Sequence, residues 1–430
     1  MTLWLGPLLA RLFGPEFGPF FQYLGVLIGI LVFFVQKEVK FHQITGYRWF
    51  ILHGVIYWVG FEMIRATFIP MIATTAFIGY TQATQPWVIQ PVSIFSVYGL
   101  NLVIMLFNFA LAQAAITWFN RKSGTVAVAQ VDGRATRNWL VVTGVVVAAW
   151  ISLSLVMLNG APEDAPTVRV AALTPNFPLP AFQDEVNTAQ MRFDVFAEQA
   201  REAAQQGAQI LYTPEMLFDF DPQVEFTDKF RALAEETGAY IFLTYTVENG
   251  GEDWRNEAVL LTPAGEFLDV YGKNHVFGEP PTPTAGVFPV YNTPLGNLAT
   301  LICHDANYTD IARKLARNGA QIIGAPYREF GGFGEQAWTN VLFRAVENRS
   351  AMVITGVATV TGIIDPYGRL VALDLNPDGA RVTLVRDVSL GSADTPFLFL
   401  GDWLGWIAMV AFAGFMVFQV VVERRAKKAT

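Results

Sequence analysis

The chain is poor in charge, in cysteine and in histidine, and each shortage excludes a class of protein. Charged residues are 15% of the 430 residues, against about 25% in an ordinary soluble chain. No basic patch points to nucleic acid. The single cysteine excludes an internal disulfide and a multi-cysteine metal site. With four scattered histidines we expect no zinc centre, and no pattern calls for a cofactor. Internal repeats and low-complexity runs are also absent.

Hydrophobic residues, by contrast, make up 53% of the chain. They are concentrated in residues 1–158 and 399–422, whereas 162–396 has the mixed composition of a water-soluble domain. Five apolar runs have the length expected of membrane spans. Residues 1–16 resemble an interfacial helix, and 67–78, interrupted by Pro70, is too short to cross. The five predicted spans are 20–36, 50–64, 92–119, 139–158 and 403–422.

Basic residues collect at 37–48, 121–137 and 424–428. The positive-inside rule assigns such segments to the cytoplasm. The spans between them then place 67–91 and the large polar segment on the outer side. We therefore divide the chain into a transmembrane helical domain, 1–159, an outer domain, 160–398, and a closing transmembrane helix with a basic cytoplasmic tail, 399–430.

The outer segment alternates apolar strands with amphipathic helices, which predicts an α/β domain with mixed sheets. A final hairpin turns on Asp365-Pro366-Tyr367-Gly368. The predicted strands are 167–173, 209–212, 240–247, 257–262, 267–271, 296–302, 321–325, 351–355, 361–364 and 370–373. The predicted helices are 184–206, 226–237, 310–318 and 335–347.

Cys303 follows the buried strand 296–302, where a strand fixes its position and a loop exposes its sulfur. A lone cysteine is more often a small buried hydrophobe. Glu215 and Lys273 nevertheless also stand at strand ends, which favours a nucleophile with a general base. Lys273 and the His304 backbone N–H would stabilise an oxyanion. Taken singly, each has a plainer interpretation, namely a solvated loop acid for Glu215 and a surface amine for Lys273.

Two nearby carboxylates have simple explanations as well. Glu279 reads as a loop acid, and Asp305 reads as a cap for the helix that follows it.

Three irregular stretches, 217–226, 276–288 and 327–338, are rich in Phe, Gly or Pro. Exposed aromatic residues would be costly in water but reasonable against acyl chains. We expect a mobile apolar lid here, or, at even odds, aromatic residues packed into the core. The residues concerned are Phe218, Phe220, Phe277, Phe330, Phe333 and Trp338.

The order Glu215, Lys273, Cys303 resembles the Glu-Lys-Cys arrangement of the nitrilase superfamily. Further motifs, in the membrane part as well as the outer domain, resemble the apolipoprotein N-acyltransferase family. They are Glu62-Met63-Ile64-Arg65, Gly79-Tyr80-Thr81-Gln82, Val97-Tyr98-Gly99-Leu100, Arg344-Ala345-Val346-Glu347-Asn348-Arg349 and Gly401-Asp402-Trp403.

That resemblance implies a nitrilase-like αββα sandwich attached to a helical transmembrane bundle. It implies a bacterial inner-membrane enzyme that moves an acyl chain from phospholipid, through a Cys303 thioester, to the N-terminal amine of a lipoprotein. Glu215 would be the base, Lys273 the oxyanion stabiliser, and Glu279, His304, Asp305 and Glu347 supporting groups. An amidase, an acyltransferase with another amine acceptor, and an inactive lipid-binding relative remain open.

Overall fold

The computed structural model describes residues 38–69, 73–123, 131–175, 188–249, 253–328, 332–357, 359–375 and 380–429. The chain forms two compact units. One contains residues 105–145 and 410–430 together with the N-terminal residues up to Trp58, and the other contains 59–104 and 146–409. All strands lie in the second unit.

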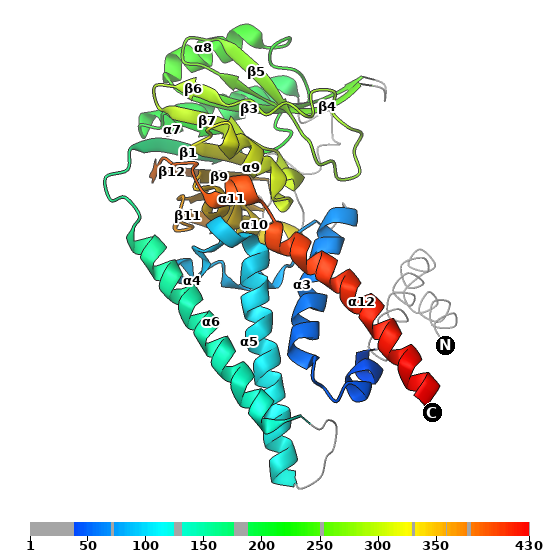
Figure 1. The fold of residues 1–430 in the computed structure, drawn as a ribbon. Coiled ribbons are helices and arrows are strands. Elements are labelled where there is room, and N and C mark those ends of the chain that lie inside the picture. Colours follow the sequence, from blue (N-terminus) through cyan, green and yellow to red (C-terminus); the bar gives the residue numbers. More distant parts are fainter. Residues whose placement is uncertain are drawn as a thin grey trace. The chain divides into compact units, whose positions relative to one another are not determined.

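Long apolar helices are present where the sequence predicts spans (Figure 1). Of the described helices, three are long and apolar enough to cross a membrane: α5 (Val92–Ser123), α6 (Gly133–Asn159) and α12 (Trp403–Ala429). The prediction for 50–64 is confirmed as a helix, α3 (Phe50–Phe68), but α3 is not among those three. The predicted segments 1–16 and 20–36 lie outside the described residues.

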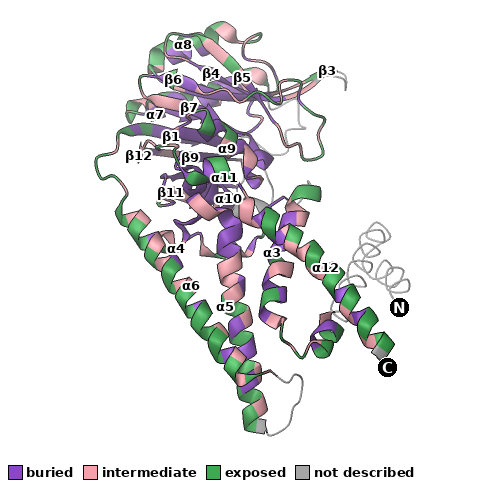
Figure 2. Cartoon of the chain, in the orientation of Figure 1, coloured by how far each residue is buried: buried purple, intermediate pink, exposed green. Residues whose placement is uncertain are grey.

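Many residues along α6 and α12 are exposed (Figure 2), and large apolar side chains are among them. Val145 is 63% exposed and Val410 is 69% exposed. In water such surfaces would favour aggregation, whereas lipid tails would cover them without loss. These helices therefore fit a multi-pass membrane protein.

The segment between α3 and α5 does not form another long helix. It contains the short helices η2 (Ile78–Gln82) and α4 (Pro86–Ile89). Residues 70–72 lie outside the description. Both short helices belong to the second unit, the one that holds the strands.

Two six-stranded mixed sheets form the centre of the second unit. The first sheet has the order β12-β1-β2-β3-β4-β5 and the second has β11-β10-β9-β8-β7-β6. The first consists of β12 (Val382–Ser389), β1 (Thr167–Thr174), β2 (Ile210–Tyr212), β3 (Tyr240–Asn249), β4 (Asp253–Leu261) and β5 (Phe267–Gly272). The second consists of β11 (Leu370–Leu375), β10 (Val360–Ile364), β9 (Ala351–Gly356), β8 (Ile322–Tyr327), β7 (Gly296–Thr300) and β6 (Tyr291–Thr293).

Apolar residues of both sheets meet in one buried cluster, so the sheets pack face to face. Val170 of β1 and Phe242 of β3 share this cluster with Ile322 of β8 and Val353 of β9. Helices α7 (Ala189–Gln205) and α8 (Thr227–Thr237) cover the outer face of the first sheet. Helices α9 (Asp310–Arg317) and α10 (Gly332–Asn348) cover the second. The result is the expected αββα sandwich.

In the part of the chain after α6, the sequence prediction missed β6, β12, the 3-10 helix η3 (Cys303–Asn307) and the short helix α11 (Pro396–Leu400). In β12 the consecutive charged residues Arg386 and Asp387 interrupt the apolar pattern. This strand is nevertheless held by antiparallel pairing with β1 over eight residue pairs. Helix α10 begins at Gly332, three residues before the predicted start. The prediction placed the start too late because the first turn is rich in glycine, which ordinarily disfavours helix.

Candidate active site

The three predicted catalytic side chains each follow a strand, and the strands come from both sheets. Glu215 lies three residues after β2, and Lys273 comes directly after β5. Strand β2 is parallel to β3, and β4 is antiparallel to both β3 and β5, so β2 and β5 end at the same edge. Cys303 follows β7 of the facing sheet. The site therefore lies where the two sheets face each other.

Lys273 is the centre of a buried ionic cluster. Its Nζ lies 3.0 Å from Oε1 of Glu215 and 2.5 Å from Oε1 of Glu279. The side chains of Lys273 and Glu215 are only 4% and 3% exposed. Such a buried charge is stable only when it is paired and hydrogen-bonded. Glu279, expected as a loop acid, thus belongs to the same cluster.

Asn256 of β4 fixes this cluster in place, and the sequence analysis missed it. Its side-chain amide donates to Oε1 of Glu215 at 2.8 Å, and its carbonyl accepts the backbone N–H of Lys273 at 3.0 Å. Its own N–H donates to Thr282 at 3.1 Å. Because β4 starts with a polar run that includes Asp253, Arg255 and Glu257, no sequence signal distinguished this buried amide from its neighbours.

The electrostatics of the cluster keep Lys273 charged. Burial disfavours its charged form, but the negative charges of Glu215, Cys303 and Glu279 outweigh burial and raise the Lys273 pKa well above its ordinary value. Burial likewise pushes the Glu279 pKa upward, but the Lys273 ammonium prevails and the pKa is lowered. Cys303 is thus one of the groups that act electrostatically on the Lys273 ammonium.

Cys303 occupies a strained turn at the end of its strand. It opens the 3-10 helix η3 (Cys303–Asn307) with φ of 49°, a left-handed conformation that is uncommon for a residue with a side chain. The thiol is 5% exposed. Such strain persists only when the surroundings hold it in place, and it is concentrated at functional sites.

Asp305 provides that support, rather than capping the following helix as predicted. Its buried carboxylate accepts the Tyr271 hydroxyl at 2.6 Å and the backbone N–H of Ile302 at 3.1 Å and of His275 at 2.7 Å. Burial raises the pKa of Asp305 to about 6, although these donors oppose the shift. The carboxylate thus joins the turn at Cys303 to β5 and the loop that carries Lys273.

His304 and Glu347 make their contacts in different places. The His304 ring lies 5.1 Å from the Phe277 ring, and its Nδ1 is 3.0 Å from the Asn307 amide. Glu347 is fully buried, 2.9 Å from Nη2 of Arg344, and accepts the Val97 backbone N–H at 3.1 Å. Its recorded partners therefore join α10 to the start of α5, and none of them is a residue of the Lys273 cluster.

The lid prediction was wrong for Phe218 and Phe220. Both are buried, and the Phe218 ring packs 5.1 Å from Phe230 of α8 and 5.7 Å from Phe196 of α7. Helices α7 and α8 cover Phe218 because their own aromatic side chains, Phe196 and Phe230, pack against its ring. Phe218 and Phe220 thus stabilise the domain from beneath α7 and α8.

The loop 276–288 forms no helix or strand, as expected, and Phe277 in it is 53% exposed. Trp338 belongs to α10 and packs partly against the core. Position 333 also lies in α10, so 332–338 is helical rather than irregular. Phe330 lies outside the described residues, as does the side chain of Phe333.

Chemically, the arrangement joins a thiol, a carboxylate and an ammonium group in a place largely shielded from water. The carboxylate can accept a proton from the thiol, and the ammonium can stabilise negative charge on sulfur or on an oxyanion. A nucleophile activated in this way attacks esters and amides. These three groups need no metal to do so.

Comparison with known families gives two matches along the chain. Residues 169–395 match the Carbon-nitrogen hydrolase family, and residues 2–110 match the Apolipoprotein N-acyltransferase N-terminal domain. The first match alone includes more than half of the chain. The second extends over the predicted membrane part.

Curated relatives fall into the same two groups. The chain is 25% identical to an apolipoprotein N-acyltransferase of Geobacter metallireducens, over 86% of this chain and 73% of the relative. It is also 25% identical to the Thermotoga maritima enzyme of that name, over 60% of this chain and 53% of the relative. Human deaminated glutathione amidase is 27% identical over 43% of this chain and 68% of its own length.

Among solved structures, a mutant amidase from Nesterenkonia sp. AN1 aligns with a TM-score of 0.46 and 22% identity. The alignment includes 55% of this chain and 95% of that one.

Proposed function

Because the chain belongs to the apolipoprotein N-acyltransferase family, within the carbon–nitrogen hydrolase superfamily, we propose that it transfers a fatty acyl chain from phospholipid to the N-terminal amine of a diacylglyceryl-cysteine lipoprotein. Cys303 carries the acyl group as a thioester. Glu215 and Lys273 assist it.

The observation that carries this proposal is the joint match of both parts of the chain. The amidase relative aligns with less than half of the chain, whereas the Geobacter acyltransferase aligns with 86% of it. The long apolar helices would bring a site of this kind to lipid, which a small-molecule amidase does not need.

In the first half of the reaction, the Glu215 carboxylate takes the proton of the Cys303 thiol. The thiolate attacks the ester carbonyl of the phospholipid, and the resulting oxyanion is stabilised by Lys273 and by the backbone N–H of His304. When the tetrahedral intermediate collapses, the carbon–oxygen bond breaks and Glu215 returns the proton to the departing lysophospholipid. The enzyme is left as a thioester.

In the second half, the amine of the acceptor attacks the thioester carbonyl. Glu215 accepts a proton from the attacking nitrogen, and the carbon–sulfur bond breaks. The proton then returns to the Cys303 sulfur, so the enzyme is regenerated and the product is an amide. Glu279 contributes by neutralising Lys273, with which it pairs at 2.5 Å.

The test is to incubate the detergent-purified chain with phospholipid and to examine Cys303 by mass spectrometry. We expect the peptide that contains Cys303 to gain the mass of one acyl group, and Cys303→Ala to abolish this gain. Turnover of substrate by Cys303→Ala would refute the assignment of the nucleophile.

The acceptor requires a separate experiment. Mass spectrometry of lipoprotein N-termini from cells with and without the gene should show N-acylation only when the gene is present. An acylated Cys303 combined with unchanged lipoprotein N-termini would instead favour another amine acceptor. Release of ammonia from small amides without any acylation would favour an amidase.

We further propose that the catalytic domain lies outside the cytoplasm, on the periplasmic side of a bacterial inner membrane. The proposal rests on the basic segments 37–48, 121–137 and 424–428. A reporter that is active only outside the cytoplasm should work when fused after residue 250 and fail when fused after residue 430. The reverse result would place the enzyme on the wrong side for lipoproteins.

A further inference from the structure

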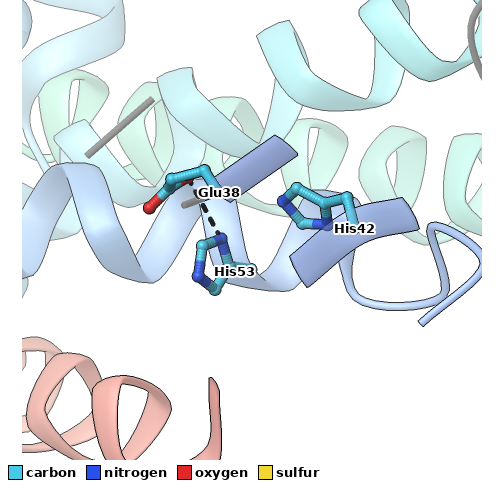
Figure 3. A group of neighbouring side chains, drawn as sticks. All are labelled: Glu38, His42 and His53. Atoms are coloured by element: carbon cyan, nitrogen blue, oxygen red, sulfur yellow. Dashed lines mark ion pairs between the residues drawn. The ribbon is translucent and has the colours of Figure 1, made fainter. Parts of the chain in front are cut away.

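Two of the four histidines meet an acidic residue in the unit that contains the N-terminal described residues. Residues 38–44 are helical, so Glu38 and His42, four positions apart, share one face of that helix. His53 projects from α3 toward them, and Figure 3 shows the three side chains converging. One potential ligand atom from each lies within 4.8 Å of the others.

The imidazoles lack the partners that buried polar groups require. His42 is 6% exposed and His53 is 0% exposed. Within the part of the chain that the structure describes, Nδ1 of His42 and both ring nitrogens of His53 make no hydrogen bond. Oε2 of Glu38 lies 3.5 Å from Nδ1 of His53. Buried polar groups are ordinarily hydrogen-bonded, so nitrogens left in this state indicate a missing ligand.

Aromatic rings hold the two histidines in fixed orientations. The His53 ring lies 4.0 Å from Tyr57 and 5.0 Å from Phe41, and the His42 ring lies 5.4 Å from Phe41. Packing of this kind orients ring nitrogens without occupying them. It thereby supplies the rigid support that metal ligands need.

We propose that Glu38, His42 and His53 bind one divalent transition-metal ion of the Zn²⁺ class. Two neutral imidazoles and one carboxylate form a ligand set that Zn²⁺ accepts, with a water molecule completing a tetrahedral site. The ion would join the helix at 38–44 to α3. This inference is independent of the proposed acyl transfer, because it concerns none of the residues of the Cys303 site.

The test uses the full-length chain in detergent, with a purification tag that contains no histidine. Cys303→Ala serves as the background, because its thiol is the one cysteine sulfur that could also bind Zn²⁺. After treatment with a chelator, isothermal titration with Zn²⁺ should show one saturable ion per chain. Replacement of Zn²⁺ by Co²⁺ should give visible d–d absorption typical of nitrogen and oxygen ligands.

Glu38→Gln and His53→Gln should each weaken Zn²⁺ binding at least tenfold and remove the Co²⁺ absorption. The Glu38 side chain is 27% exposed, so Glu38→Gln should fold even if His53→Gln does not. His275→Gln is the matched control, because His275 belongs to the other unit and its ring pairs with Asp310 at 2.9 Å. Unchanged binding in Glu38→Gln, an equal loss in His275→Gln, or no saturable binding in the background protein would each overturn the proposal.

Discussion

Lys273→Met is the sharpest test of the buried ionic cluster. Methionine fills most of the lysine volume but leaves Glu215 and Glu279, which are 3% and 14% exposed, without their shared cation. Removing one partner of a buried ion pair costs about 3–5 kcal/mol. For a domain of this size that corresponds to a melting temperature lower by roughly 6–20 °C.

The loss should depend on pH in a defined direction. In the native protein Lys273 lowers the Glu279 pKa, so this pairing stabilises the fold above the unfolded carboxyl pKa of about 4.3 and is lost as pH falls. Without Lys273, burial and mutual repulsion raise the carboxyl pKa values. The folded variant then binds protons more tightly than its unfolded chain, and its stability falls as pH rises. The difference in stability between the native protein and Lys273→Met should therefore be largest near about pH 8 and shrink toward about pH 5.

Thermal unfolding followed by tryptophan fluorescence measures this difference. Glu215→Gln added to Lys273→Met should restore part of the melting temperature, because one stranded charge is removed. Lys314→Met is the matched control, since Lys314 is 44% exposed and pairs with Asp310 at the surface, where such pairs contribute about 0–1 kcal/mol. A Lys273→Met protein with the native pH profile, or a double variant less stable than the single one, would refute the reasoning.

Three further predictions concern the surroundings of the site. Phe218→Ala should lower the free energy of unfolding by about 3–5 kcal/mol, because it opens a cavity in the core. Phe277→Ala, at an exposed position, should change the free energy of unfolding by less than about 0.5 kcal/mol but slow the reaction with long-chain phospholipid. The reverse pattern would reject Phe277 as a lipid contact. Tyr271→Phe removes a hydrogen bond to the buried Asp305 carboxylate and should cost about 1.5–3 kcal/mol in denaturant unfolding, whereas no change would show that this bond does not hold the turn at Cys303. Burial would raise the Asp310 pKa, but His275 and Lys314 hold it at about 2. The Asp310 carboxylate should therefore stabilise the fold above about pH 4, and this stabilisation should be lost as pH falls toward 2. Asp310→Asn should remove this part of the pH dependence of the melting temperature.

Sequence alone determined the parts of the molecule that depend on neighbouring residues. Apolar runs long enough for helices to cross a lipid bilayer are a local property, and α5, α6 and α12 are present where those runs predict them. The alternation of apolar strands with amphipathic helices likewise predicted an α/β domain with mixed sheets, and the family resemblance implied the αββα class. The strand ends that carry Glu215, Lys273 and Cys303 could be located because a strand, the turn after it and the reactive residue are contiguous.

Tertiary structure alone decided how distant segments meet. Strand β12 reads as irregular, yet it pairs with β1, more than two hundred residues earlier in the chain. Asn256 became a partner of Glu215 only because β4 lies beside β5 and begins at the edge where β2 ends. Phe218 was expected either on a lid or in the core, and it is core because α7 and α8 close over it.

The histidines show the same limit. Scattered along the sequence, they predicted no metal site, but folding brings His42 and His53 together beside Glu38. Periodicity and turn signals describe what a segment prefers locally. Which side chains become neighbours is set by the burial of apolar surface over the whole chain, and that burial is known only when every element has its place.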